Sequence, residues 1–560
     1  MADSQQVLVP YPVPSFKGGY NSYSASKNNI QDNEIPLGNG VELDDNGSMT
    51  KSAGSIRFGG QLASGHAVMG MGLLSNPSYN VPIAACNTGW YNINGVTNTS
   101  TILTGKTFTA DLPTDFMEAN SKLYGANGTD DLCYTADGAT VVDINSNGNI
   151  GRWPTFYNAR IYMTNTTYPD RVYYSNPYSI DDTQNPPLFT GFDDANMFNT
   201  NLSASPKKNA GYFILQPGSG VVITTIFPDG GYLYLYTLRN GTWQVGAVST
   251  ANADGSIAHT IQQVSLRGNS TSGRSVIKNL NDQWFYNQDG YYSYGEVATY
   301  QSPRQSIQSG RIKSELNSVA VTGKNAVAAI PFQEKVIIAY QVGSYNDRIV
   351  KFDNRIQAYS TPRSGINASC FLEYLDSTQT RRLLAGSSNS ADSYVYQIET
   401  GTNVNGAAIS SYFETKSFDC GNPGLVKRIG FIDVFYALLV GTITYYVYGD
   451  ESNLLATDSI QLGTSATATS GIGSRIIGTF LIGEEFSSSI ASTTTNSTFR
   501  IDCGFSACKR VSVQFQNSTL SEQFKIDSMV IYYLPGSIYE TSDGIVSTAT
   551  APNTYPNIYP

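Results

Sequence analysis

Short apolar runs alternate with polar turns along most of this chain, and apolar positions recur at every second residue, not at helical spacing. Between residues 151 and 410 the runs are four to seven residues long, the length and period of half-buried β-strands. Segments 159–177, 220–246, 276–295 and 326–360 show this best. We therefore predict antiparallel meanders in this part of the chain.

The four segments carry their own turn signals, which are rich in Gly, Pro, Asn and Asp. The predicted turns are a Thr/Asn/Pro stretch within 159–177, residues 228–231, residues 287–290, and a turn at Asp353 and Asn354. In segment 326–360 we expect a strand, a polar loop, a second strand, this last turn, and a final strand that ends at Tyr359.

Such meanders bury an aromatic face only against a neighbour, and radial closure removes the exposed sheet edges. The sequence thus predicts an all-β fold with a β-propeller over 61–410, in which 61–150 is poorly assigned and leaves room for an inserted subdomain. Longer alternating strands in 411–536 predict an additional C-terminal β-sandwich. We expect residues 1–60 to be an extended N-terminal arm and residues 537–560 an extended C-terminal tail.

Charge is sparse and spread along the chain. Charged residues make up 14% of the 560 residues, against about 25% in typical soluble domains. The formal net charge is -10, and no run of Lys or Arg marks a phosphate-binding patch. Tight nucleic-acid binding is therefore disfavoured, whereas a wall past which DNA slides would fit this surface.

Neither a signal peptide nor a membrane span is expected. The first residues lack a basic stretch followed by an apolar one, so we expect synthesis in a cytoplasm. The most apolar stretch, 431–448, is interrupted by Asp433 and Gly441 and falls short of about 20 apolar residues. It predicts two buried strands that meet around Val440 and Gly441.

Six cysteines are scattered along the chain, at Cys86, Cys133, Cys370, Cys420, Cys503 and Cys508. A cytoplasmic chain of this length needs no disulfide, so we expect buried free thiols. Cys503 and Cys508 are close enough in sequence to pair or to bind a metal, and the sequence leaves their pairing open.

Candidate catalytic and metal-binding patterns are weak. Only His66 and His259 occur, so a multi-His metal site is excluded, and we expect both in loops or at the surface. Residues 143–148 match the first half of a calcium loop, but Pro154 stands where the bidentate Glu belongs. A turn between strands is the favoured interpretation.

Residues 240–243 resemble only the end of an Asp-box turn and predict a hairpin with a packed Trp243. Adjacent carboxylates point to opposite faces of a strand, so the doublets are expected in solvated turns and not as acid/base pairs. The doublets are Asp44/Asp45, Asp181/Asp182 and Asp193/Asp194. The sequence predicts no catalytic, cofactor-binding or metal-binding residues, no cofactor and no enzymatic activity.

The beginning of the chain carries a spaced pattern made of Gly18, Gly19, Asn21, Ile30, Asp32, Glu34, Asp44, Gly47, Lys51 and Gly54. With this pattern it resembles the opening of the tail and neck propeller proteins of tailed bacteriophages. Gly40 departs from the pattern, which usually has Asn there. Segments 159–177, 220–246, 284–295 and 381–429 are similar to that family's blades in the same order, so the resemblance spans most of the chain.

The resemblance implies a structural virion protein, of the nozzle or hub type or of the type that stabilises packaged DNA. It implies a homo-oligomeric ring, with six copies, around the DNA exit channel of the tail. The implied partners are portal or adapter proteins and tail fibres or spikes. DNA would pass without sequence-specific binding, and the family supplies no catalytic residue to carry over.

Two other functions stay open. A glycan- or receptor-binding propeller at a tail tip or head fibre would use exposed Tyr and Trp side chains to stack on sugars. A propeller hydrolase would need facing carboxylates, which the sequence does not signal.

Overall fold

Strands dominate the chain in the computed structural model. The structure describes residues 7–23, 27–144, 150–176, 179–181, 188–191, 197–198, 210–251, 257–266, 268–288, 290–297, 302–437, 441–462 and 496–536. Helical turns among these residues are α1 (Lys313–Asn317), η3 (Gly273–Ser275), η4 (Gly310–Ile312) and η5 (Val321–Gly323). The predicted all-β fold class is confirmed. In this described part, no helix has the length and apolarity needed to cross a membrane.

The chain divides into two compact units. The first contains residues up to Ser52, Arg355–Thr361 and residues from Ala408 onward. The second contains Ala53–Asn354 and Pro362–Ala407. The predicted boundaries at 61, 411 and 537 stay predictions, but the structure groups the start of the chain with its C-terminal part.

Seven small sheets follow one another along the described part of the second unit, and the strands of the first six pair antiparallel. The first three sheets are β8 (Val68–Asn76), β9 (Tyr79–Cys86), β10 (Gly89–Asn94) and β11 (Thr99–Ile102); β12 (Asp115–Ala119), β13 (Lys122–Ala126), β14 (Cys133–Thr135) and β15 (Val142–Asp143); and β16 (Gly151–Tyr157), β17 (Arg160–Asn165), β18 (Arg171–Tyr174) and β21 (Gly211–Ile214). A hairpin of β19 (Ser179–Asp181) and β20 (Leu188–Gly191) lies between β18 and β21 in the sequence. The described strands of the stretch 61–150, which the sequence could not assign, thus form two of these sheets.

The remaining sheets continue the same pattern. They are β22 (Ile223–Asp229), β23 (Tyr232–Thr237), β24 (Thr242–Ala251) and β25 (Ile257–Ser265); β26 (Ile277–Asn279), β27 (Asp282–Asn287), β28 (Gly290–Val297) and β29 (Ser302–Ile307); β30 (Ala328–Phe332), β31 (Lys335–Gln341), β32 (Asn346–Asp353) and β34 (Arg363–Ser364); and β35 (Cys370–Leu375), β36 (Arg381–Gly386), β37 (Val395–Ile398), β7 (Ser55–Arg57), β38 (Asn403–Val404) and β39 (Ala407–Ala408).

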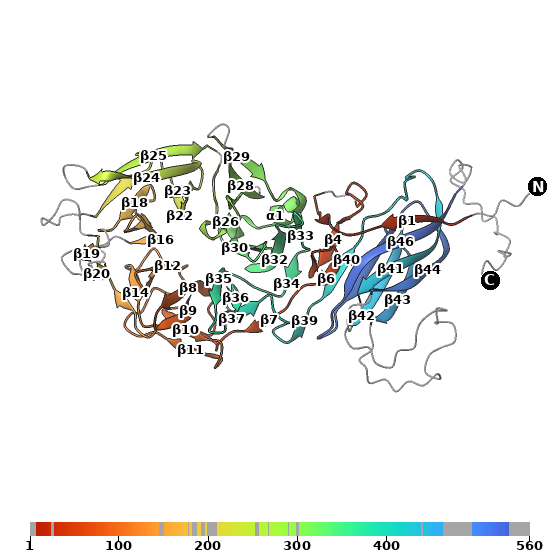
Figure 1. Ribbon diagram of the computed structural model, residues 1–560, viewed down its shortest axis with the longest axis horizontal. Coiled ribbons are helices and arrows are strands. Elements are labelled where there is room, and N and C mark those ends of the chain that lie inside the picture. The colour runs from red at the N-terminus through yellow and green to blue at the C-terminus, as the bar shows by residue number, and fades with distance from the viewer. Residues whose placement is uncertain are drawn as a thin grey trace, which may run out of the picture. The chain divides into compact units, whose positions relative to one another are not determined.

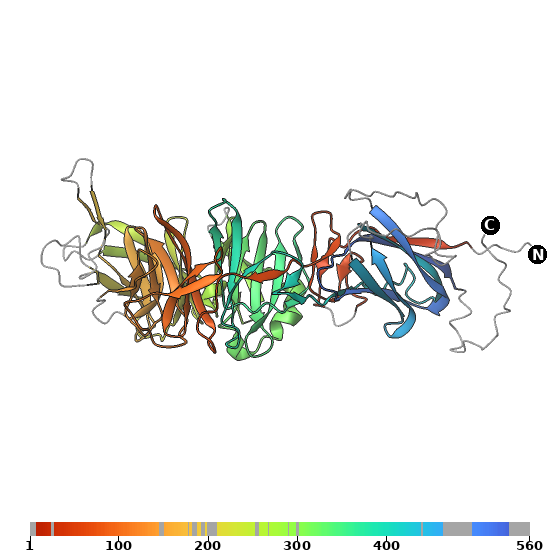
Figure 2. The same cartoon turned by 90° about the horizontal axis from the view of Figure 1, so that it is seen from below.

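The first strands of these sheets contact one another in a circuit around a common centre (Figure 1). β8 contacts β12, β12 contacts β16, and β16 contacts β22. The turn η3, which leads into β26, contacts both β22 and β30. β30 then contacts β35, and β35 contacts β8, so the last sheet meets the first. Seen from the edge in Figure 2, the same sheets stand side by side, with their strands running in similar directions.

Apolar side chains fill the space between neighbouring sheets. Separate buried clusters join the first sheet to the second, the second to the third, the third to the fourth, the fourth to the fifth, and the sixth to the seventh. Between the fifth and sixth sheets the ring centroids of Trp284 and Phe352 lie 5.1 Å apart. A further cluster, which includes Val68 and Leu384, joins the seventh sheet to the first. The prediction that each meander is buried against its neighbour is confirmed.

The seventh sheet is completed by a strand from the beginning of the unit. β7 pairs antiparallel with β37, with Ile56 opposite Gln397. Backbone hydrogen bonds lie on both sides of this pairing. Phe58 N donates to Val395 O at 2.8 Å, and Gly54 N donates to Gly401 O at 2.7 Å. The two ends of the second unit are therefore hydrogen-bonded within one sheet.

The first unit is a sandwich of two sheets with one apolar core. One sheet holds β44 (Asn496–Cys508), β41 (Lys427–Ala437), β46 (Lys525–Pro535), β6 (Met49–Lys51), β5 (Val41–Leu43) and β1 (Val9–Val13), and the other holds β4 (Leu37–Asn39), β40 (Ser411–Glu414), β45 (Val511–Asn517), β42 (Gly441–Gly449) and β43 (Asn453–Leu462). Short strands outside these sheets are the parallel pair β2 (Gly19–Tyr20) and β3 (Glu34–Ile35). Ile432 of one sheet and Val447 of the other belong to the same buried cluster.

Several sequence predictions can be checked directly. The turns at 228–231 and 287–290 separate β22 from β23 and β27 from β28 as expected. Segment 431–448 contains β41 and β42, as predicted, although residues 438–440 lie outside the described residues. In segment 326–360 the structure has one strand more than predicted, because a turn at Gln333, whose φ is 54°, separates β30 from β31. That turn contains neither Gly nor Pro and gave no signal.

Four of the described strands before Ser52, which are β1, β4, β5 and β6, belong to the sandwich, and this differs from the expected extended arm. β1 runs antiparallel to β46, β6 also pairs with β46, and β4 pairs with β40. An extended segment carries unpaired backbone N–H and C=O groups, and the edges of the two sheets satisfy them.

A buried lysine fixes the end of this N-terminal segment. Lys51 is 2% exposed, and its Nζ donates to Asn517 Oδ1 at 2.8 Å and to Thr519 O at 3.0 Å. Burial lowers the pKa of the Lys51 ammonium. Asn517 Nδ2 in turn donates to Glu522 Oε2 at 2.8 Å and to Thr442 O at 2.7 Å. The network joins β6, β45 and β42.

Replacing this lysine tests how strongly the N-terminal strands stabilise the sandwich. Lys51→Met should lower the free energy of unfolding by about 2 kcal/mol, because the buried Asn517 side chain and the Thr519 carbonyl lose their donor. The exposed Lys313→Met is the matched control and should change it by less than about 0.5 kcal/mol. Calorimetry of the full chain measures both, and equal stability of the two variants would contradict a structural role for Lys51.

Candidate functional site

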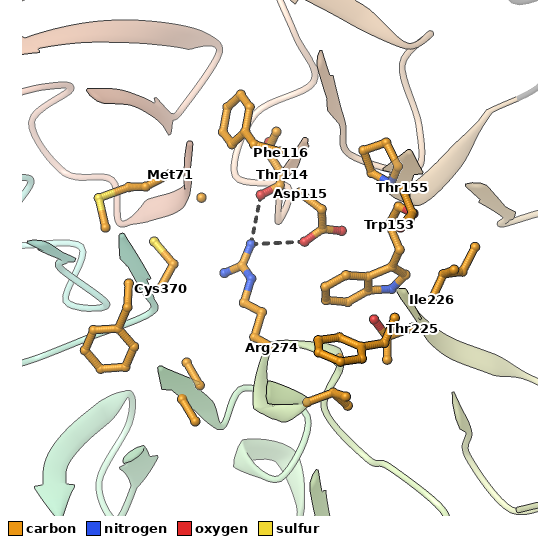
Figure 3. Close-up of a pocket in the computed structure, with 18 residues that line it drawn as sticks. Met71, Thr114, Asp115, Phe116, Trp153, Thr155, Thr225, Ile226, Arg274 and Cys370 are labelled. Atoms are coloured by element: carbon orange, nitrogen blue, oxygen red, sulfur yellow. Dashed lines mark hydrogen bonds and ion pairs between the residues drawn. The ribbon is translucent and has the colours of Figure 1, made fainter. Parts of the chain in front are cut away.

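A cavity of about 300 Å³ lies where the first strands of the seven sheets converge. Six of these strands and the turn η3 supply its walls. The lining residues are Gly70, Met71, Thr114, Asp115, Phe116, Trp153, Pro154, Thr155, Thr225, Ile226, Phe227, Gly273, Arg274, Val276, Ala328, Ala329, Cys370 and Phe371. Figure 3 shows Arg274, Trp153 and Cys370 approaching the centre from different sides. We call this space the central cavity.

Arg274 spans the central cavity. It starts from η3, and its guanidinium donates to three backbone carbonyls: Nη2 to Met69 O and to Thr114 O at 3.1 Å, and Nη1 to Ser369 O at 3.2 Å. These carbonyls belong to residues at the start of the first, second and seventh sheets. One cation beside the fifth sheet therefore holds three sheets on the other side of the centre.

Asp115 lies between two guanidinium groups. Its Oδ1 is 3.5 Å from Arg274 Nη2, and its Oδ2 is 2.8 Å from Arg152 Nη2. Arg152 Nε also donates to Asp115 Oδ2 at 2.9 Å. The Asp115 side chain is 6% exposed. The two guanidinium groups therefore stabilise its negative charge in place of water. The cluster has two positive charges and one negative charge.

Trp153 reaches the central cavity through an irregular backbone. It lies in β16, where the pairing with β17 shifts register between Arg152 and Thr155. Its φ is 57°, a left-handed conformation that is strained for a bulky side chain. A Cβ on Gly273 would lie 2.1 Å from the Trp153 ring, so only glycine permits the indole in this position. The bulge turns the side chain into the cavity.

Two neighbouring inner strands have similar irregularities. The register of β8 shifts between Val68 and Gly70, and that of β22 shifts between Ile223 and Thr225. A Cβ on Gly70 would lie 1.9 Å from Thr114 O, so glycine is required where β8 approaches the segment before β12. Bulges end regular pairing next to the cavity and free backbone carbonyls such as that of Met69 to bind Arg274.

The two histidines lie apart from this cavity. His66 Nδ1 is 2.8 Å from Asp111 Oδ1 in an exposed turn, which agrees with the loop prediction. The prediction is wrong for His259, which lies on β25 with its ring centroid 4.8 Å from that of Phe213 and 5.0 Å from that of Tyr174. Aromatic neighbours on the third sheet hold this side chain half-buried.

The suggested calcium loop is only partly described. Asp143 ends β15 and forms an ion pair with Lys106, with 2.5 Å between Nζ and Oδ2. Residues 145–149 lie outside the described residues, and Pro154 lines the central cavity. In the ranges that the structure describes, no group of three or more His, Cys, Asp or Glu residues could hold a metal ion.

The turn predictions at the remaining candidates can be compared with the structure. Residues 240–243 form the hairpin between β23 and β24, and Trp243 Nε1 donates to Asn240 O at 3.1 Å, so that prediction is confirmed. Asp44 Oδ1 accepts a hydrogen bond from Ser48 N at 2.9 Å in a turn. Asp45 forms an ion pair with Arg355, with 2.6 Å between Oδ1 and Nη2. Three further doublet members, at positions 182, 193 and 194, lie outside the described residues.

All six cysteines are buried free thiols, as predicted, and this includes Cys503 and Cys508. Burial raises the pKa of Cys420, Cys503 and Cys508 to about 12. Burial also raises the pKa of Cys370, beside the central cavity.

The comparisons with known proteins assign no family. No family model and no curated protein matches the chain. Among solved structures, the extracellular domain of a putative one-component system from B. thetaiotaomicron matches at 8% identity and a TM-score of 0.40. The match covers 77% of this chain and 58% of the chain in that structure. BamB from Moraxella catarrhalis matches at 9% identity and a TM-score of 0.35, covering 64% of this chain and 92% of its own. U3-55K matches at 7% identity and a TM-score of 0.35, covering 62% of this chain and 98% of its own. The chain thus spans little more than half of the first of these structures.

Removing the central guanidinium tests whether it holds the sheets together. Arg274→Met should destabilise the second unit by about 3 kcal/mol or more, because Asp115 and three carbonyls lose a charged donor. Arg381→Met, which removes an exposed ion pair with Glu373, should cost less than about 1 kcal/mol. Calorimetric unfolding of the full-length variants gives both values. If Arg274→Met loses no more free energy of unfolding than Arg381→Met, Arg274 does not hold the sheets together.

Thiol reactivity tests the burial of the cysteines. At pH 8 a thiol with a pKa near 12 is almost entirely protonated, and only the thiolate attacks a disulfide reagent. We expect no fast reaction of the native chain with Ellman's reagent, and reaction of all six thiols after unfolding in guanidinium. Fast labelling of Cys503 or Cys508 in the native chain would contradict the structure.

Proposed function

We propose that this chain is a structural component of a bacteriophage tail, that its seven small sheets are the blades of a closed β-propeller, and that copies of it form part of a ring, of the nozzle or hub type, around the DNA exit channel. In this proposal the chain joins adapter proteins to fibres or spikes and resides in the virion. The copy number of six comes from the family resemblance alone.

Three observations support the closed propeller. The first strands of the sheets, together with the turn η3 between β22 and β30, contact one another in an unbroken circuit. A buried cluster joins the seventh sheet to the first. β7, from the beginning of the unit, is hydrogen-bonded into the last sheet, and this leaves no gap at which the circuit would open.

The observation that carries the structural role is the path of residues 9–57. This segment supplies β1, β5 and β6 to one sheet of the sandwich, β4 to the other, and β7 to the seventh sheet of the second unit. The pairings of β1 and β6 with β46, of β4 with β40 and of β7 with β37 join positions far apart in sequence, so pulling either end of the chain must break several ladders together. A part that bears load during DNA ejection would need this property.

The charge pattern supports the proposed contact with passing DNA. The chain carries 34 basic and 44 acidic residues, and many of the described basic side chains form ion pairs, among them Lys106, Arg152, Lys278, Arg382 and Arg500. Neutralised cations release few counterions from DNA, so they give little affinity. Such a wall would let DNA slide without holding it.

Electron microscopy of the phage particle with this chain labelled tests the proposal. We expect density for several copies in a closed ring whose axis coincides with the DNA channel of the tail. A label on the capsid surface or at a fibre tip, away from that axis, would refute the ring role and leave the propeller fold unaffected.

A glycan- or receptor-binding role is the second candidate, and one surface favours it. Tyr168 and Tyr212 are each 46% exposed. Arg171 lies against both, with its Cζ 3.8 Å from the Tyr168 ring centroid and 4.9 Å from that of Tyr212. Exposed rings held in place in this way suit stacking on a sugar. Binding of the full chain on a glycan array, abolished by Tyr212→Ala, would favour this role over the structural one.

A further inference from the structure

The central cavity contains a strained aromatic side chain, Trp153, which is partly buried against the apolar cluster between the third and fourth sheets. Trp153 has a left-handed φ of 57° in a bulge of β16, although a regular strand would place this side chain without strain. Strain of this kind persists where the surrounding structure enforces it, and it is concentrated at ligand sites. The indole is only partly buried and faces a space of about 300 Å³. The indole is thus an apolar ring in the wall of the cavity, and the Arg152 guanidinium lies over it, with Cζ 4.9 Å from the ring centroid.

The polar groups around the indole combine donors and acceptors. Thr155 Oγ1 donates to Trp153 O at 3.0 Å, and Thr114 Oγ1 donates to Leu112 O at 3.3 Å. Each hydroxyl has thereby used its hydrogen and keeps lone pairs to accept with. The Asp115 carboxylate adds further acceptor positions, and the Arg274 guanidinium adds donors.

The charges disfavour an ionic ligand. A cation would meet the guanidinium groups of Arg152 and Arg274 beside a single carboxylate. An anion would have to compete with Asp115 for the same two guanidinium groups, and Arg274 is further committed to three carbonyls. A neutral ligand avoids both costs. If it carries several hydroxyl groups, each can donate to one wall and accept from another.

We propose that the central cavity binds the ring of a neutral sugar, with its less polar face stacked on Trp153 and its hydroxyls hydrogen-bonded to Asp115, Thr155 and Thr114. The volume is at the lower end of the range for small-molecule sites, about 300–1,000 Å³, and so accommodates one sugar ring and not an oligosaccharide. This inference needs only the cavity and does not depend on the proposed place in a phage tail.

Saturation-transfer NMR of the full chain with free glucose, galactose, mannose and N-acetylglucosamine tests the proposal. At least one of these sugars should receive saturation, with a dissociation constant of about 1 mM, as expected for so small a ligand. Trp153→Ala should weaken this binding by about tenfold or more. Tyr79→Ala removes a partly exposed aromatic ring outside the central cavity and is the matched control, which should bind as the unchanged chain does.

A second variant keeps the test independent of the folding of Trp153→Ala. Ala329→Phe leaves the indole and the charged groups in place and fills the cavity, so it should abolish binding while the melting temperature stays within a few degrees. The proposal is overturned if none of the four sugars receives saturation at about 50 mM, far above the expected dissociation constant. It is also overturned if a sugar binds equally well to the unchanged chain and to Ala329→Phe.

Discussion

Each small sheet of the second unit has apolar faces that only a neighbouring sheet can cover, and the rest of the structure depends on this constraint. A single repeated sheet cannot bury its apolar faces alone, and only its stacked neighbours cover them. Clusters between successive sheets provide the cover, and the cluster with Val68 and Leu384 provides it between the last sheet and the first. Because every sheet needs two neighbours, the circuit must close, and β7 supplies the strand that ties its two ends together.

Closure brings the first strands of the sheets to one centre, where some backbone carbonyls need a donor from outside their own sheet, and Arg274 supplies it. Backbone carbonyls at the bulged or irregular starts of these strands cannot all find partners within their own ladders. The guanidinium of Arg274 binds the carbonyls of Met69, Thr114 and Ser369 at once, while Asp115 compensates its charge. The central cavity is the space between the Arg274 side chain and the strained Trp153. Stability and a binding space thus come from the same convergence of strands.

The sequence predicts what depends on neighbouring residues and misses what depends on distant ones. The turn with Gly230 and Gly231 could be predicted because both need positive φ, at 59° and 83°. The turn at Gln333 could not, since it contains neither Gly nor Pro. Arg274 carried no signal, because its partners Met69 and Thr114 are 205 and 160 residues away and bind it only through their carbonyls. For the sheets within 61–150, glycines such as Gly70 obscured the strand pattern, although close approach of the chain requires them.

The central claim is that the seven sheets close through β7. Hydrogen exchange of the backbone amides beside this strand tests the claim most directly. Gly54 N and Phe58 N donate to Gly401 O and Val395 O, so their exchange should be as slow as that of amides in β36 and should require opening of the whole unit. Exchange of these two amides at the rate of an unstructured peptide, with β36 still protected, would contradict closure through β7.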